Sequence, residues 1–230
     1  MATQSETATE ARIPLSRERV LAAAIDLADE GGIDALSMRK LGLELGVEAM
    51  SLYNHVSNKE DLLDGMVDAI VQEIAPLEGG SDWKAMIRQR AYSAREVLTR
   101  HQWAPRLIET RSEPSPTMMA YMDSAIGILI EGGFSMDLTH HALHVLGSRI
   151  LGFTQELFDD SSNEADSPEA EALMLQQLLQ AYPNIAAMAA GANHDGDSIL
   201  GPGCDSDMEF TFALDLILDG LESMRDREAS

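Results

Sequence analysis

The stretch from residue 37 to residue 56 constrains the fold of this chain more than any other segment. Leu41 and Leu45 stand four residues apart behind Ser37, a typical N-cap residue, and together they predict a short helix. Gly46 follows at once and supplies the positive φ that ends a helix sharply. The segment therefore predicts one short helix, a tight turn and a second short helix.

The second helix carries its hydrogen-bonding side chains away from its buried side. Leu52 and Val56 predict that buried side. The other faces hold Ala49, Met50, Ser51, Tyr53, Asn54 and His55. A polar outer face of this kind predicts a helix-turn-helix whose second helix lies in the major groove of DNA. An ordinary helical hairpin is the alternative interpretation.

The charge of the chain is distributed unevenly along its length. The net charge is −23, but residues 1–60 hold six basic and ten acidic residues and account for only −4 of it. Arg39, Lys40 and Lys59 bracket the second helix. The acidic remainder repels phosphate, which disfavours non-specific binding to DNA and binding to an anionic membrane surface.

The rest of the chain has helical periodicity, and no segment alternates apolar and polar residues as a half-exposed strand does. Alanine, leucine, methionine and glutamate are abundant and favour helix. We therefore predict an all-α chain, with helices over residues 17–30, 37–45, 48–56, 57–74, 83–100, 103–109, 114–131, 136–158, 168–190 and 207–225.

These helices suggest two domains behind a disordered tail of residues 1–14. Residues 15–75 form the three-helix DNA-binding head with its connecting helix, and residues 76–80 are a hinge rich in glycine. Residues 81–228 form a larger helical domain for ligand binding and dimerisation, because the helices over 136–158 and 207–225 are apolar on most sides.

The lack of an apolar run of membrane-spanning length and of a second cysteine bears on the cellular location of the protein. No apolar run approaches the roughly 18 residues of a membrane span. Cys204 is the only cysteine, so an internal disulfide is excluded and a reducing cytoplasm is expected.

At this point the chain resembles the TetR family of transcriptional repressors. In the head, the resemblance rests on Gly46-Val47, Leu52-Tyr53, His55-Val56, Asn58-Lys59 and Leu62-Leu63. In the body it rests on Leu77-Glu78-Gly79 ahead of Asp82-Trp83, Gly132-Gly133-Phe134-Ser135, Gly152-Phe153 and Leu214 to Leu221.

The resemblance implies a homodimer that binds palindromic, double-stranded operator DNA and is released by a small-molecule inducer. It implies neither an enzyme nor a cofactor. The DNA-binding residues expected from the pattern are Ser37, Arg39, Ala49, Met50, Ser51, Tyr53, Asn54, His55 and Lys59.

Different chemistry is expected from different members of this set. Arg39 reads guanine O6 and N7, whereas Ala49 and Met50 contact a thymine methyl group. Asn54 either reads adenine or faces solvent. Phosphates are held by Ser51, Tyr53, His55 and Lys59.

The ligand region departs from the family's founding member, the tetracycline repressor. There an Asn, a Phe and a metal-ligating His hold metal-chelated tetracycline; counted from Trp83, their positions here are Arg90, Ala94 and Ile108. We therefore expect no metal, and an inducer that is at least partly apolar, because methionine suits a cavity for apolar ligands. The expected ligand-binding residues are Met86, Arg90, Ala94, Trp103, Leu107, Ile108, Met118, Tyr121, Met122 and His144.

Two other functions remain open at the level of sequence. His140 and His144 stand one helical turn apart, the spacing at which two imidazoles share a metal ion. A helical metal-binding protein or enzyme that uses His140, His141 and His144 is therefore the alternative. A helical adaptor whose head binds protein is the third possibility.

Overall fold

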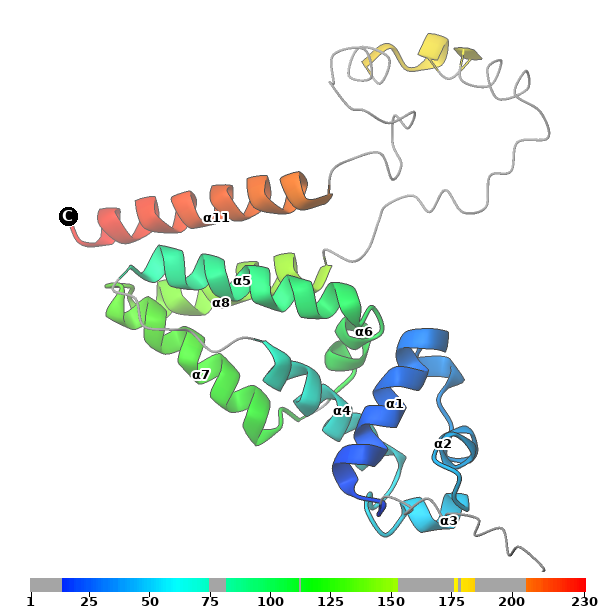
Figure 1. Ribbon diagram of the computed structural model, residues 1–230. Helices are drawn as coiled ribbons and strands as arrows, with labels where there is room; N and C mark the ends of the chain where they lie inside the picture. The colour runs from blue at the N-terminus through cyan, green and yellow to red at the C-terminus, as the bar shows by residue number, and fades with distance from the viewer. Residues whose placement is uncertain (1–13, 75–81, 112, 153–175, 178, 185–205) are drawn as a thin grey trace, which may run out of the picture. The chain divides into compact units, whose positions relative to one another are not determined.

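Every regular element in the described part of the chain is a helix, which confirms the all-α prediction (Figure 1). The computed structural model describes residues 14–74, 82–111, 113–152, 176–177, 179–184 and 206–230. The expected tail up to residue 13, the hinge at 76–80, the end of the 136–158 helix, most of the 168–190 helix and Cys204 lie outside these residues. The helices form two compact units, one of Met1–Pro76 with Tyr92–Ser124 and one of Leu77–Ala91 with Ala125–Ser230.

The head of the first unit is built on five elements. They are α1 (Arg17–Gly31), the 3-10 turn η1 (Ile33–Ala35), α2 (Met38–Glu44), α3 (Ala49–Leu52) and α4 (Lys59–Glu73). Side chains cap the longer helices: Ser16 Oγ accepts from Arg19 N at 3.3 Å, and Asn58 Oδ1 accepts from Asp61 N at 2.8 Å. The fully buried core of the head comprises Val20, Ala24, Leu41, Leu52, Leu62, Met66 and Ile70.

The corner between α2 and α3 depends on two glycines. Gly46 has a φ of +65°, as expected from its place after the first helix. Gly42 was not singled out by the sequence pattern. A Cβ atom there would lie 2.9 Å from Val47 O and 3.1 Å from Ala49 N, so only glycine lets the two helices approach this closely.

The second helix of the pair is shorter than the predicted span of 48–56. Regular helix ends at Leu52, and the chain continues in turns whose amides bond three residues back, with Tyr53 N donating to Met50 O and His55 N to Leu52 O. Asn54 and His55 have low helix propensity, which accounts for the early end of α3. The predicted buried side is confirmed, since Leu52 and Val56 are inaccessible to solvent.

The first unit also holds α6 (Ala104–Glu109) and parts of two long helices, α5 (Trp83–Arg100) and α7 (Pro116–Glu131), which contribute residues to both units. The second unit adds α8 (Met136–Gly152) and α11 (Ser206–Glu228). The predicted positions of α5, α6, α7 and α11 are confirmed to within a few residues.

The second unit combines aromatic packing with ion pairs. Trp83 packs edge-to-face on Phe134, with ring centroids 4.6 Å apart, and Gly132 leaves room for the Trp83 side chain. Lys84 Nζ lies 2.6 Å from Asp219 Oδ1, which ties α5 to α11 within this unit.

Candidate nucleic-acid interface

Two contacts hold the start of the first helix of the helix-turn-helix in place. Ser37 Oγ accepts a hydrogen bond from Lys40 N at 3.2 Å and so acts as the N-cap of α2. Lys59 Nζ donates to Leu36 O at 3.4 Å from the first residue of α4. These contacts fix where α2 begins, so Ser37 has a structural role in addition to the DNA contact expected for it.

The predicted DNA-binding residues lie together on the outer side of this motif. Met50 is 74% exposed and Tyr53 is 42% exposed. Arg39, Asn54 and Lys59 are also exposed. The remaining members, Ala49, Ser51 and His55, are half-buried.

Arg39 is available for a contact outside the chain. The structure shows no ion pair between Arg39 and Glu44, and within the described head no hydrogen bond holds the Arg39 guanidinium. A guanidinium exposed beside the helix-turn-helix has the donor geometry that matches guanine.

An ion pair that the sequence did not predict supports the end of α3. Arg17 Nη2 lies 2.6 Å from Asp61 Oδ1, while Arg17 Nη1 donates to His55 O at 3.0 Å. Ser57 N donates to Asp61 Oδ2 at 2.7 Å. The hydrogen bond from Arg17, with that from Ser57, lowers the pKa of Asp61 from its ordinary value of 3.8 to about 2. The carboxylate therefore stays charged throughout the neutral range.

A cluster around the buried side chain of His101 links the head to the corner between α5 and α6, and the sequence did not predict it. His101 Nδ1 lies 2.9 Å from both carboxylate oxygens of Asp29, and His101 Nε2 lies 3.3 Å from Glu73 Oε2. Trp103 Nε1 donates to Asp29 Oδ1 at 2.6 Å, and Arg100 Nη1 donates to Glu73 Oε2 at 2.5 Å. We call these five residues the His101 cluster.

Further contacts join α4 to the segment between α6 and α7. Arg111 Nη1 lies 2.8 Å from Glu60 Oε2 and 3.1 Å from Asp64 Oδ1. Ser115 Oγ donates a short hydrogen bond to Asp68. The connecting helix is thus bound to α6 and its neighbours along most of its length.

The predicted ligand-binding residues are distributed over four helices. Met86, Arg90 and Ala94 lie on α5; Trp103 is the N-cap of α6, which carries Leu107 and Ile108; α7 carries Met118, Tyr121 and Met122; and α8 carries His144. Arg90, Ala94, Trp103 and Leu107 are buried, whereas Met122 and His144 are exposed. Met86, Arg90 and His144 belong to the second unit and the others to the first.

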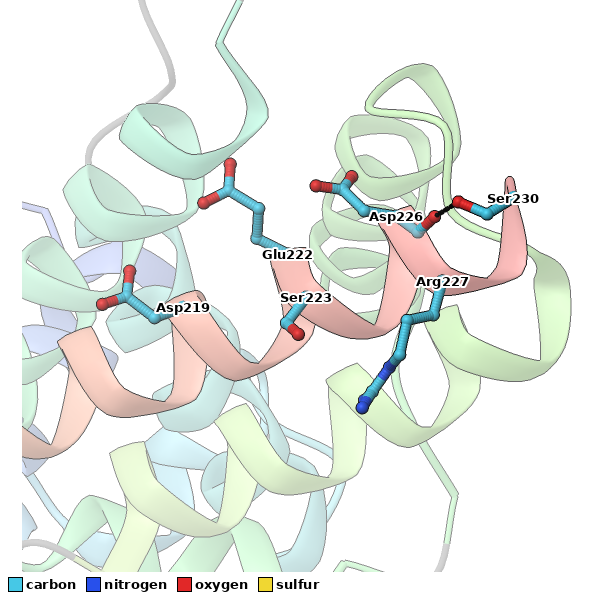
Figure 2. Close-up of a pocket in the computed structure, with 6 residues that line it drawn as sticks. All are labelled: Asp219, Glu222, Ser223, Asp226, Arg227 and Ser230. Carbon is cyan, nitrogen blue, oxygen red and sulfur yellow. Dashed lines mark hydrogen bonds between the residues drawn. The ribbon is translucent and has the colours of Figure 1, made fainter.

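The end of α11 forms an open hollow of about 450 Å³ that contains none of these residues (Figure 2). Its lining is mainly acidic and consists of Asp219, Glu222, Ser223, Asp226, Arg227 and Ser230. An exposed acidic hollow offers neither the apolar lining nor the enclosure typical of a small-molecule site.

The three histidines of α8 do not form a metal centre in the described part of the chain. His140 and His144 stack edge-to-face with centroids 4.6 Å apart, but all three rings are exposed. Among the described residues, no group of three or more His, Cys, Asp or Glu side chains is placed to hold a metal ion. Nor is any described helix both long and apolar enough to cross a membrane.

A helical head with an exposed helix-turn-helix defines a DNA-binding protein, and comparison with known proteins gives its family. Residues 20–66 match the model of bacterial regulatory proteins of the tetR family, and residues 75–225 match the tetracyclin repressor-like C-terminal domain. The chain therefore belongs to the TetR family. It is a ligand-responsive transcriptional repressor and not an enzyme.

Similar proteins come from several bacteria. An HTH-type transcriptional regulator of Saccharopolyspora erythraea is 33% identical over 75% of this chain and 74% of its own length. The class D tetracycline repressor protein of Escherichia coli is 30% identical over 72% and 77%. Apo ActR of Streptomyces coelicolor has a TM-score of 0.73 at 27% identity, over 96% of this chain and 100% of that one.

Proposed function

We propose that this repressor binds a palindromic operator as a homodimer in the cytoplasm, and that a small, at least partly apolar ligand releases it. The exposed outer side of the helix-turn-helix carries this proposal. Arg39 on α2, Met50 on α3 and Tyr53 at the C-cap of α3 have their side chains exposed to solvent. An apolar and cationic surface of this kind fits base edges and phosphates.

An exposed apolar row on α11 supports the homodimer. The row has a spacing of four residues, about one turn, and comprises Met208, Phe212 and Leu216. A contiguous apolar surface on an exposed helix is typical of protein interfaces. A two-fold dimer places one head on each half of a palindrome.

The contacts of α4 support a mechanism for the response. Ligand binding beside α6 displaces α6, and α4 follows because Glu60, Asp64 and Asp68 are bonded to the α6–α7 segment. The two heads fit one operator only when they lie about one DNA turn, roughly 34–36 Å, apart. A ligand shifts this spacing only by its differential affinity for the two arrangements.

The ligand itself is expected to be apolar with one anionic group. Met86 supplies an adaptable apolar contact. Arg90 is buried on α5 and carries a permanent positive charge, which suits a carboxylate or an ionised phenol. ActR of Streptomyces coelicolor, with 27% identity, has been solved in complex with actinorhodin, which supports a small-molecule ligand for this chain.

Selection of DNA from a random duplex library by the purified full-length protein tests the proposal. We expect a palindromic consensus, and a loss of about 1–3 kcal/mol of sequence discrimination in the Arg39→Ala variant. Arg106→Ala removes another exposed cation, from α6, and serves as the matched control. Selection of no consensus, or an equal loss in both variants, contradicts the proposed mode of binding.

Mass spectrometry of small molecules released from the purified protein tests the response. A compound that dissociates the selected duplex from the wild-type protein is expected, together with weaker binding of that compound to Arg90→Met. Unchanged affinity of Arg90→Met for the compound would exclude Arg90 from the ligand site.

A further inference from the structure

His101 is a buried histidine whose two ring nitrogens both face carboxylates. Only 4% of the residue is exposed. Nδ1 lies 2.9 Å from each oxygen of Asp29, and Nε2 lies 3.3 Å from Glu73 Oε2. The ring stands between the end of α5 and the start of α6, since His101 N donates to Val97 O and Ala104 N donates to His101 O.

This arrangement determines the protonation state that fits. An ionised carboxylate only accepts hydrogen bonds, so each ring nitrogen of His101 must donate one. Neutral imidazole carries a single N–H and would direct a lone pair at either Asp29 or Glu73. Only imidazolium, with two N–H groups, satisfies both contacts.

The charges around the ring give the same result. Asp29 from α1 and Glu73 from α4 carry two negative charges, and Arg100 from α5 contributes one positive charge through Glu73. Trp103, the N-cap of α6, adds a neutral N–H to Asp29. With imidazolium the cluster is neutral, whereas with neutral imidazole it keeps one uncompensated negative charge beside a buried ring.

The cluster joins elements with different tasks inside one compact unit. Asp29 lies near the C-terminal end of α1, and Glu73 is the last residue of α4, so both belong to the head. Trp103 belongs to the predicted ligand-binding set. The cluster is therefore a direct connection between the head and the corner where α6 begins.

We propose that His101 is a proton-dependent positioning residue that fastens the head to the start of α6. As imidazolium it binds Asp29 and Glu73 together, and loss of its proton repels one of them and frees the end of that helix. Histidine is the side chain that ordinarily gains and loses a proton in the physiological pH range. The repressor then responds to pH in addition to its ligand. The effect of pH on operator binding rests on the proposed function, whereas the effect of pH on stability does not.

Unfolding of the full-length protein tests the proposal without DNA. The stabilisation from the imidazolium form is present at low pH and is lost as pH rises. His101→Gln, which keeps one donor and never charges, is expected to lower the Tm by several degrees near pH 6 and by less than half of that near pH 8.5. A neutral, hydrogen-bonded histidine would give a Tm difference between wild type and His101→Gln that is equal at both pH values or larger at the higher one. Either result overturns the proposal.

A second variant tests the charge argument with little change in shape. The amide of Glu73→Gln both donates and accepts, so it tolerates neutral His101, and the pH dependence of the Tm is expected to flatten while the fold is kept. A pH profile identical to that of the wild type overturns the proposal. His141→Gln, which replaces an exposed histidine of α8, is the control and should retain the wild-type profile.

Operator affinity tests whether the His101 cluster affects DNA binding. The ratio of affinities for the selected duplex near pH 6 and near pH 8.5 is expected to differ several-fold between the wild type and His101→Gln. Equal ratios would show that the cluster does not reach the DNA-binding surface and would overturn its regulatory role. The unfolding experiments need no operator, so failure of the repressor proposal is recognised separately, by the absence of any selected duplex.

Discussion

At the scale of single residues, Arg17 and Asp61 help to hold the recognition element in place. The Arg17 guanidinium neutralises Asp61 and also donates to the carbonyl group of His55, three residues after the end of α3. The predicted DNA-contacting side chains were accessible to sequence analysis because a helical period of 3.6 residues shows which positions face outward. The Arg17–Asp61 pair was not, because 44 residues separate its members and no periodicity connects them.

Replacement of Asp61 by Asn should reveal this pair through its pH dependence. The pKa of Asp61 is lowered from 3.8 to about 2, so its stabilisation is present above pH 4 and is lost as the pH falls towards 2. The pair is partly exposed, and we expect a loss of only about 1 kcal/mol at neutral pH. Urea unfolding of wild type and variant at pH 7 and at pH 3 measures this difference in the free energy of unfolding. A difference between wild type and variant that grows on acidification contradicts the assignment.

At the scale of elements, helix positions followed from the sequence far better than helix contacts did. The periods and caps of α1, α4 and α5 define their ends to within a residue or two. The 3-10 turn η1 has too few residues to show a period, and the early end of α3 depends on local hydrogen bonding. The His101 cluster joins residues 72 positions apart, so only the folded chain brings it together.

The close approach of α2 and α3 leads to a prediction at Gly42. In Gly42→Ala the new Cβ atom meets backbone atoms of Val47 and Ala49 that no rotamer change moves away. We expect a loss of about 1–3 kcal/mol in the free energy of unfolding and weaker operator binding, because α3 is displaced.

Gly127→Ala is the matched control for this substitution. Gly127 lies in α7 with no atom within 4 Å of a new Cβ, so alanine should stabilise that helix by about 0.5–1 kcal/mol. Denaturant unfolding of both variants distinguishes crowding from propensity. A Gly42→Ala protein as stable as the wild type would show that α2 and α3 separate without cost.

At the scale of the whole molecule, the acidic charge and the apolar row of α11 bear on how copies of the chain are expected to meet each other and DNA. The net charge of −23 lies mostly outside the head, so within the described residues we expect the helix-turn-helix, with Arg39, Lys40 and Lys59, to be the surface that attracts DNA. Sequence analysis proposed the helices of the dimer surface from their excess of apolar residues. It did not show which of those residues stay exposed in one chain, because that depends on packing within the unit.

Phe212→Glu should separate the proposed dimer. Phe212 is 63% exposed at the middle of the α11 row, and a charge there would be buried on association. Sedimentation should show a monomer at concentrations where the wild type is dimeric, with loss of tight operator binding. Ile130→Glu, at an exposed apolar position of α7, is the control and should remain dimeric. A dimeric Phe212→Glu protein would exclude this row as the interface.

Contacts at the two ends of α1 limit how the sequence of such a head can change in evolution. Arg17 fastens the first turn of α1 beside the recognition element, and Asp29 fastens its far end to His101 and Trp103. Twelve residues of helix, about 18 Å, separate the two anchors. One residue inserted between them would rotate Asp29 by about 100° around the helix axis and separate it from its partners. Evolution is thus free to change the exposed side chains of α1 but not its length.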